Sequence, residues 1–220
     1  PRRRTRATIA REKGLDKLAE MIFKQEIDDP FREALGYVNC EKGVETADEA
    51  VAGARDIIAE QISEDISARR IIRRLFFQEG LIESRAVKGK EEEGLKYGNY
   101  FDWQEPVKRA PSHRVLAMFR GENEGYLRIK IRPPEEKALL SLQNIFIRGS
   151  GPASSQVILA IKDSYSRLLA PSIENDIRKQ AKERADEEAL EVFARNLRNT
   201  LMAPPMGQRS VLAIDPGYRT

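Results

Sequence analysis

The chain has 220 residues, of which 40% are hydrophobic and 33% charged, and its 38 Lys and Arg against 35 Asp and Glu give a formal net charge of +3. This length suffices for one large domain or two small ones, and the lack of any run of about 18 apolar residues excludes a membrane-spanning helix. The single cysteine, Cys40, excludes an internal disulfide and a cysteine-based zinc site, and no secretory pattern stands near the start, so we expect a cytoplasmic protein.

Positive charge is concentrated at the amino end. Residues 1–24 hold eight Lys and Arg against three Asp and Glu, which leaves the rest of the chain slightly negative. Such a basic segment at the amino end of a nearly neutral chain indicates an anionic partner. The alternative is that these residues are only a helix start or linker exposed to solvent. Because no acidic residue precedes Glu12, we expect a dense cationic patch free of nearby acids. Its arginines are candidates for nucleic-acid phosphates: Arg2, Arg3, Arg4, Arg6 and Arg11.

Apolar spacing predicts helices through the first part of the chain. A rough stripe over residues 9–22, from Ile9 onward, indicates a helix that Gly14 can split in two. Asp29 followed by Pro30 is typical of a helix start and predicts a short helix through residue 35.

The residues TADE at 46–49 predict the next helix start. They match a capping box, in which the Thr46 hydroxyl and the Glu49 carboxylate close free amide groups reciprocally. The helix behind this box carries apolar residues at helical spacing as far as Ile62.

A second helix is expected over residues 64–78, with Ile71, Ile72 and Leu75 toward the core and Gly80 as its end. The following LIESRAV reads as extended. The succession of a helix, a turn at Gly80 and a short extended segment is typical of a helix-turn-helix or winged-helix unit. Paired short helices also occur in ordinary helical domains. Four basic residues lie on the exposed side of the second helix: Arg69, Arg70, Arg73 and Arg74.

Residues 87–103 change character, because glycines interrupt regular structure and lysines alternate with aromatic residues. Cations that hold phosphates beside aromatic rings that stack on bases would make a single-strand binding surface, with Lys88 and Lys90 as candidates. The three glutamates at 91–93 oppose this reading. The alternative is that the aromatic side chains anchor the loop to the domain.

The remaining elements are mostly helical. A helix is expected from Ser112 to Gly121, then a half-buried strand at residues 126–131, where apolar and basic residues alternate. Helical spacing continues over residues 139–146 and 157–169. Pro171 is expected to separate the latter from a long helix at 172–201, whose apolar stripe includes Ile173, Ile177, Ala181, Ala185, Ala189, Val192, Phe193, Leu197 and Leu201.

The end of the chain reads as a linker followed by a new strand. Residues 211–214 are apolar, and Asp215 follows them directly. A carboxylate at the end of a buried strand is how many metal-dependent nucleases begin their active sites, but a metal needs ligands from several strands. We therefore expect no catalytic residue, no metal site and no cofactor in the chain.

Five blocks of sequence carry a resemblance to a known family. They are RRRTRATIAREKGLDKLA, VKGKEEEGLKYGNYFDWQEP, PSHRVLAMFRGENEGYLRI, LAPSIENDIRKQAKERADEEALEVFARNL and APPMGQRSVLAIDPGYRT. In this order they resemble the Tex family of bacterial transcription accessory proteins, and they span nearly the whole chain. The resemblance implies a helical region with a helix-turn-helix part at residues 1–203. Residues 204–220 would then be a linker and the first strand of a ribonuclease H-like, resolvase-related domain.

The resulting expectation is a mainly α fold: a multi-helix scaffold with one short β element and that first strand. The resemblance implies a non-catalytic scaffold of a nucleic-acid-binding transcription accessory protein, binding RNA or single-stranded DNA weakly, with the transcription machinery as a further partner. Two alternatives stay open. One is a resolvase-type nuclease whose catalytic domain begins at Asp215, and the other is a protein-interaction module that docks on the transcription machinery.

Overall fold

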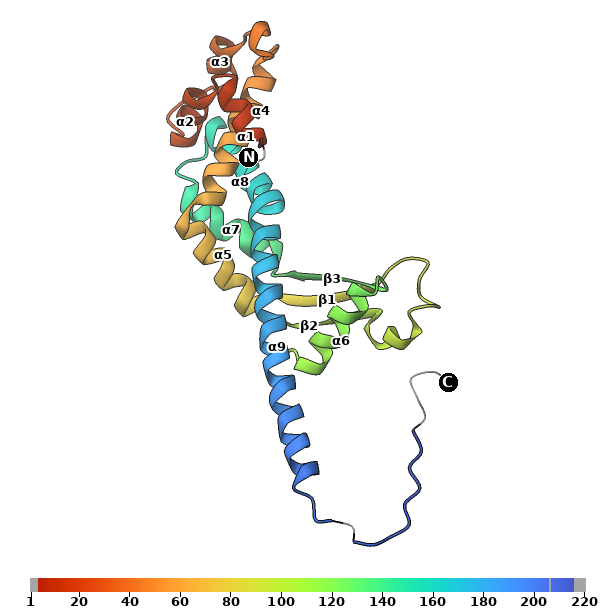
Figure 1. Cartoon of the computed structure of the whole chain (residues 1–220). Helices are drawn as coiled ribbons and strands as arrows, with labels where there is room; N and C mark the ends of the chain where they lie inside the picture. Colours follow the sequence, from red (N-terminus) through yellow and green to blue (C-terminus); the bar gives the residue numbers. More distant parts are fainter. Residues whose placement is uncertain (1–3, 206, 216–220) are drawn as a thin grey trace.

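The computed structural model describes residues 4–205 and 207–215. It is mainly helical, as expected, and it is elongated (Figure 1). A bundle of helices at the amino end surrounds α4 (Ala47–Glu64), a small sheet lies farther along, and the long helix α9 (Ala170–Leu201) runs beside both and beyond them.

Three short helices pack against α4. They are α1 (Arg6–Glu12), α2 (Asp16–Lys24) and α3 (Pro30–Ala34), and all three contact α4. Gly14 splits the first two as predicted, since its φ of 86° is a left-handed conformation that glycine adopts without strain. Ile9 departs from the predicted stripe, because 40% of it is exposed.

The start of α4 differs in one detail from the predicted capping box. The Thr46 hydroxyl accepts the Glu49 N–H at 3.2 Å, as expected. The Glu49 carboxylate, however, accepts the N–H of Glu45 at 2.8 Å rather than that of Thr46. The carboxylate therefore binds an N–H one residue farther back than in the capping box, and it still satisfies a backbone donor near the helix start.

Helix α5 (Ile66–Glu79) follows α4 with one residue between them. Asp65 ends α4 and caps α5, where its carboxylate accepts the Ala68 N–H at 2.7 Å. Ile72 is buried and Leu75 partly buried, but Ile71 points outward with 38% of its surface exposed, contrary to the prediction. The helix-turn-helix interpretation stays a prediction, since that motif usually has a turn of three or four residues.

The sheet has three antiparallel strands in the order β2-β1-β3: β1 (Leu81–Ala86), β2 (Asp102–Pro106) and β3 (Leu127–Arg132). The sequence predicted the extended β1 and the strand β3, but β2 was missed because its start was assigned to the loop. One face carries Ile82, Ile129 and Ile131 into the core. Helix α6 (Ser112–Asn123), two residues longer than predicted, packs against β3 and α9.

The free edge of β3 is hydrogen-bonded by side chains from two helices. Glu174 of α9 accepts the Ile131 N–H at 2.8 Å, and Glu122 of α6 accepts the Ile129 N–H at 3.1 Å. Arg178 of α9 donates to the Ile129 carbonyl at 3.0 Å and forms an ion pair with Glu122. Three backbone groups at this edge, the N–H groups of Ile129 and Ile131 and the carbonyl of Ile129, are therefore satisfied without a fourth strand.

The chain returns through α7 (Glu135–Phe146) and α8 (Pro152–Asp163) into one continuous helical rod. Pro171 does not separate two helices, contrary to the prediction. A π-helical segment, η4 (Ser164–Leu169), lies between α8 and α9 and interrupts the regular hydrogen-bond ladder just before the proline. Since proline has no N–H and its ring conflicts with the carbonyl four residues earlier, this irregular stretch is where a helix can accommodate it.

The carboxyl-terminal half of α9 and the tail leave the body (Figure 1). The predicted apolar stripe is buried only as far as Ala185, and Val192, Phe193, Leu197 and Leu201 are exposed. Residues 211–214 form no strand, contrary to the prediction, and their large apolar side chains are exposed. The boundary predicted between residues 203 and 204 stays a prediction.

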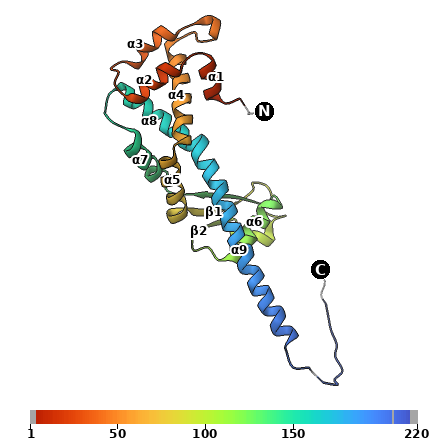
Figure 2. The same cartoon turned by 60° about the vertical axis from the view of Figure 1, so that its left-hand side comes forward.

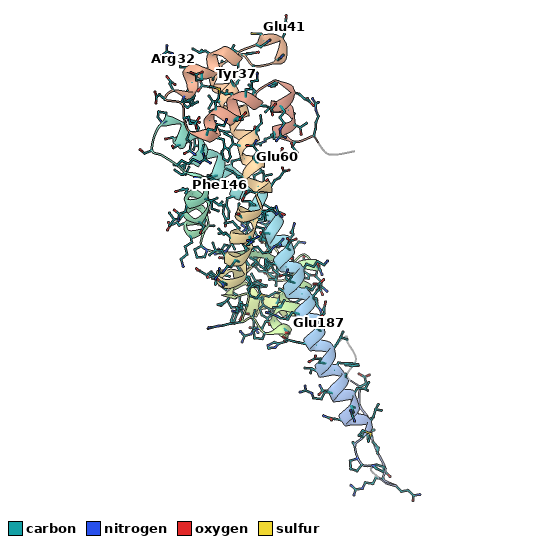
Figure 3. The ribbon with its side chains drawn as sticks, turned by 90° about the vertical axis from the view of Figure 1, so that its left-hand side faces the viewer. Arg32, Tyr37, Glu41, Glu60, Phe146 and Glu187 are labelled. Carbon is teal, nitrogen blue, oxygen red and sulfur yellow. The ribbon has the colours of Figure 1, made fainter. Side chains whose placement is uncertain are left out.

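The side chain of Gln25 ties α2 to the connection between α7 and α8. Its amide donates to the carbonyl of Phe146, labelled in Figure 3, at 2.7 Å and accepts the Arg148 N–H at 3.0 Å. The backbone of Gln25 is left-handed, with φ 60°. We expect Gln25→Ala to lower the free energy of unfolding by about 1–3 kcal/mol, because two hydrogen bonds are lost and the strained φ is kept.

Gln25→Gly is the matched variant. It loses the same hydrogen bonds but removes the left-handed strain, so chemical denaturation should place it about 1 kcal/mol above the alanine variant. An alanine variant as stable as the parent would show that the two side-chain bonds contribute nothing.

Candidate nucleic-acid interface

Of the predicted amino-terminal arginines that the structure describes, Arg4 and Arg11 are paired with carboxylates. Arg2 and Arg3 lie outside the described residues. Arg4 forms an exposed ion pair with Glu12, and its hydrogen bond lowers the pKa of that carboxyl group below its usual value. Arg6 is exposed and lies at a shallow hollow shared with Asp56.

Arg11 is bound more closely. Its Nη1 lies 2.5 Å from Glu60 of α4, and its Nε lies 3.6 Å from Asp16. Glu60, labelled in Figure 3, also accepts the Thr5 hydroxyl at 2.8 Å. The expected freedom from nearby acids is therefore wrong for Arg4 and Arg11, and Arg11 ties α1 to α4. Phosphate binding by the amino end of the chain stays a prediction.

The loop between β1 and β2 is anchored by its aromatic residues. Tyr97, in the short 3-10 helix η3 (Leu95–Tyr100), is buried, and its ring lies 6.1 Å from that of Tyr126. Trp103 is partly buried under Arg114, whose guanidinium lies 4.9 Å from the ring centre. These rings pack against other side chains of the protein. The structure therefore fits the alternative prediction, that the aromatic side chains anchor the loop to the domain.

Lys88 and Lys90 are both exposed. The Val87 N–H donates to the Tyr126 carbonyl at 2.9 Å, which places the two lysines just beyond the end of β1 and beside the start of β3. Lys90 Nζ lies next to Gly125. The structure thus brings both lysines to one end of the sheet, while Arg4, Arg6 and Arg11 lie at the amino-terminal helices.

The outer face of the sheet adds three cations at that end. Arg85 of β1 stands directly opposite Arg128 of β3, and Lys130 stands opposite Glu83. These side chains line a hollow of about 400 Å³. Neither Arg85 nor Arg128 has an ion-pair partner within the described part of the chain, although Asp102 lies opposite Arg85 on the other side. The alternating pattern of residues 126–131 predicted the outward basic side chains of β3. It could not predict that Arg85 lies opposite Arg128, because that position depends on the register between the two strands.

The arginines of α5 line a second basic surface, a groove against α9. Arg69 donates to the Ser63 carbonyl and to the Ser172 hydroxyl, each at 3.2 Å, and Arg73 forms an ion pair with Asp176 at 2.6 Å. Arg70 and Arg74 lie on the exposed side, as predicted. This hollow has a volume of about 560 Å³.

Within residues 4–205 and 207–215, no group of three or more His, Cys, Asp or Glu side chains is placed to hold a metal ion. None of the helices described combines the length and the apolar character needed to cross a membrane. Asp215 lies in the tail, beyond the last helix.

Comparison with known proteins identifies relatives along the whole chain. Residues 25–193 match the family described as Tex central region-like. The chain is 40% identical to the uncharacterized protein YdcI of Bacillus subtilis and 37% identical to the transcriptional accessory protein Tex of Neisseria gonorrhoeae, with all of this chain covered in both. It is 26% identical to the human S1 RNA-binding domain-containing protein 1, with 98% of this chain covered. The chain spans 31%, 30% and 23% of these three relatives.

Proposed function

The chain belongs to the Tex family, and on that premise we propose that it is a non-catalytic scaffold that binds nucleic acid in a transcription accessory protein. The names of two relatives support this proposal, since one is a transcriptional accessory protein and the other is named for an S1 RNA-binding domain. The helical rod and the bundle would supply the scaffold, and RNA or single-stranded DNA would be the ligand.

The observation that carries the binding proposal is the cationic end of the sheet. Like charges directly opposite each other on neighbouring strands repel, as Arg85 and Arg128 do, and a bound phosphate would relieve this repulsion. Lys130 lines the same hollow, and the exposed Lys88 and Lys90 lie just beyond this end of the sheet. We call these five residues the sheet-end cluster.

The sheet-end cluster suits phosphates rather than bases. It contains no aromatic residue, and the aromatic side chains of the neighbouring loop pack into the fold. Arginine and lysine contacts to phosphates carry no sequence information, so binding would be indifferent to sequence. Its dissociation constant should be in the non-specific range, about 10⁻⁴ to 10⁻⁶ M.

Salt dependence tests the cluster. Five phosphate contacts on a single strand give a slope of log K against log salt of about −3.5, taking about 0.7 per contact. We expect Arg85→Glu with Arg128→Glu to reduce the slope by about 1.4 and to weaken binding of a labelled oligouridylate, followed by fluorescence anisotropy at several salt concentrations.

Arg195→Glu with Arg198→Glu is the matched control, because it makes the same change in net charge on the exposed end of α9. Arg4→Ala with Arg6→Ala tests the amino-terminal prediction in parallel. If the salt dependence of binding falls in the amino-terminal variant and is unchanged in the sheet variant, the binding surface lies at the amino end of the chain. If the parent chain does not bind at all, the proposal of nucleic-acid binding is wrong.

The proposal of a non-catalytic role is tested separately. Residues 211–214, which would present Asp215 at a strand end in a nuclease, form no strand. We expect no cleavage of DNA or RNA by this chain in Mg²⁺ or Mn²⁺, measured by gel electrophoresis of labelled substrates. Metal-dependent cleavage that disappears in Asp215→Asn would support the resolvase-type alternative instead.

A further inference from the structure

The groove between α5 and α9 has a form that the binding of phosphates does not explain. Two adjoining hollows share Phe77, Ile177 and Gln180, so they make one continuous groove. It follows α5 along the first half of α9, and the two helices lie side by side in Figures 1 and 2. We call it the α5–α9 groove.

Its floor is apolar and accessible. Ile66 at one end is 73% exposed and Phe77 farther along is 48% exposed, while the buried Ile177 lies between the helices. Large apolar side chains at this exposure are unfavourable in water, and covering them with another apolar surface would stabilise a complex. A ligand for this groove should therefore bring apolar side chains.

The walls are cationic. Arg69, Arg70, Arg73 and Arg74 line the first hollow, and Lys108 and Arg184 line the second. Among the residues that the structure describes, none that lines either hollow carries a carboxylate. Arg73 is already paired with Asp176, and Arg184 donates to backbone carbonyls, so Arg70 and Arg74 are the arginines best placed to receive new anions.

We propose that the α5–α9 groove docks an acidic amphipathic segment of a partner protein. Its apolar side chains would lie on Ile66 and Phe77, and its carboxylates would pair with Arg70 and Arg74, where the fork of the guanidinium matches a carboxylate. Charge complementarity along the whole groove selects such a segment over a neutral or basic one.

Nucleic acid fits this groove less well. Bases bind by stacking on open aromatic faces, whereas the floor offers one ring, and Lys108 Nζ already lies 5.6 Å from its centre. The remaining floor is aliphatic. This docking site is independent of the sheet-end cluster, so either proposal can fail while the other stands.

The test uses the 220-residue chain and a labelled synthetic peptide of about 14 residues, roughly the length of α5. The peptide carries Leu or Phe at every third or fourth position and Glu elsewhere, and a second peptide replaces each Glu by Gln. We expect the parent chain to bind only the glutamate peptide in fluorescence anisotropy. Arg70→Glu with Arg74→Glu should weaken this binding by more than about tenfold.

Two further variants separate specific docking from general attraction of charge. Ile66→Ser keeps every charge and should weaken the glutamate peptide by about fivefold, since it removes exposed apolar floor. Arg195→Glu with Arg198→Glu should bind as the parent does. Because these positions are exposed, circular dichroism should show the parent helix content in each variant.

Several results would overturn the docking proposal. They are no binding of the glutamate peptide by the parent, equal binding of the glutamine peptide, and parental affinity in the Arg70 and Arg74 variant or in Ile66→Ser. An oligouridylate that displaces the peptide and loses its own binding in Arg70→Glu with Arg74→Glu would assign the groove to nucleic acid instead.

Discussion

Replacing Glu174 by alanine should lower the free energy of unfolding by about 3 kcal/mol. The carboxylate is buried, accepts the Ile131 N–H at 2.8 Å and lies 2.8 Å from Arg132. Its removal leaves a buried backbone donor unsatisfied at the edge of β3 and a partly buried guanidinium without its partner. Urea unfolding followed by circular dichroism measures the loss.

Glu174→Gln is the control, because the amide oxygen can still accept the Ile131 N–H while the charge is lost. We expect it to keep about half of the stability that the alanine variant loses. Alanine and glutamine variants of equal stability would mean that the ion pair with Arg132 accounts for the whole effect. An alanine variant as stable as the parent would contradict the role of Glu174 at the strand edge.

Ile173→Ala is expected to cost about 2–5 kcal/mol, because Ile173 is fully buried where α9 meets the body and the smaller side chain leaves a cavity. Phe193, on the same predicted stripe, is 65% exposed. Phe193→Ala should therefore change the free energy of unfolding by less than about 0.5 kcal/mol. Both values come from the same denaturation experiment.

This pair compares one apolar stripe in two environments. If Phe193→Ala proves as costly as Ile173→Ala, the far half of α9 is covered in solution, and sedimentation of the parent and the variant would show whether a second copy covers it. If Ile173→Ala costs little, the buried seam between α9 and the body is not a stabilising contact.

Local signals in the sequence predicted much of the fold. The cap at Thr46, the proline start at Pro30 and the glycine break at Gly14 all depend on neighbouring residues, and all three helix boundaries are confirmed. Helical periodicity also predicted α9, but it cannot show which turns meet a neighbour. Phe193 and Ile173 therefore looked alike in the sequence.

Long-range contacts were not predictable in the same way. Glu60 is 49 residues away from Arg11 along the chain, so the carboxylate that binds Arg11 most closely could not be foreseen. Arg85 meets Arg128 only because of the register between β1 and β3. Lys88 and Lys90 were recognised from composition, while Arg128 and Lys130, which stand near them, come from β3, a strand distant in sequence.

The side chains along β3 also determine how this sheet can meet other proteins. An unprotected edge strand invites strand addition and aggregation, because its backbone groups pair with any extended chain. At β3 an incoming strand would have to displace Glu122, Glu174 and Arg178 from hydrogen bonds already made. The opposite edge, β2, has five residues and ends in Pro106, which has no N–H to donate. Both edges thus resist growth of the sheet, which leaves side-chain surfaces rather than backbone pairing for recognition.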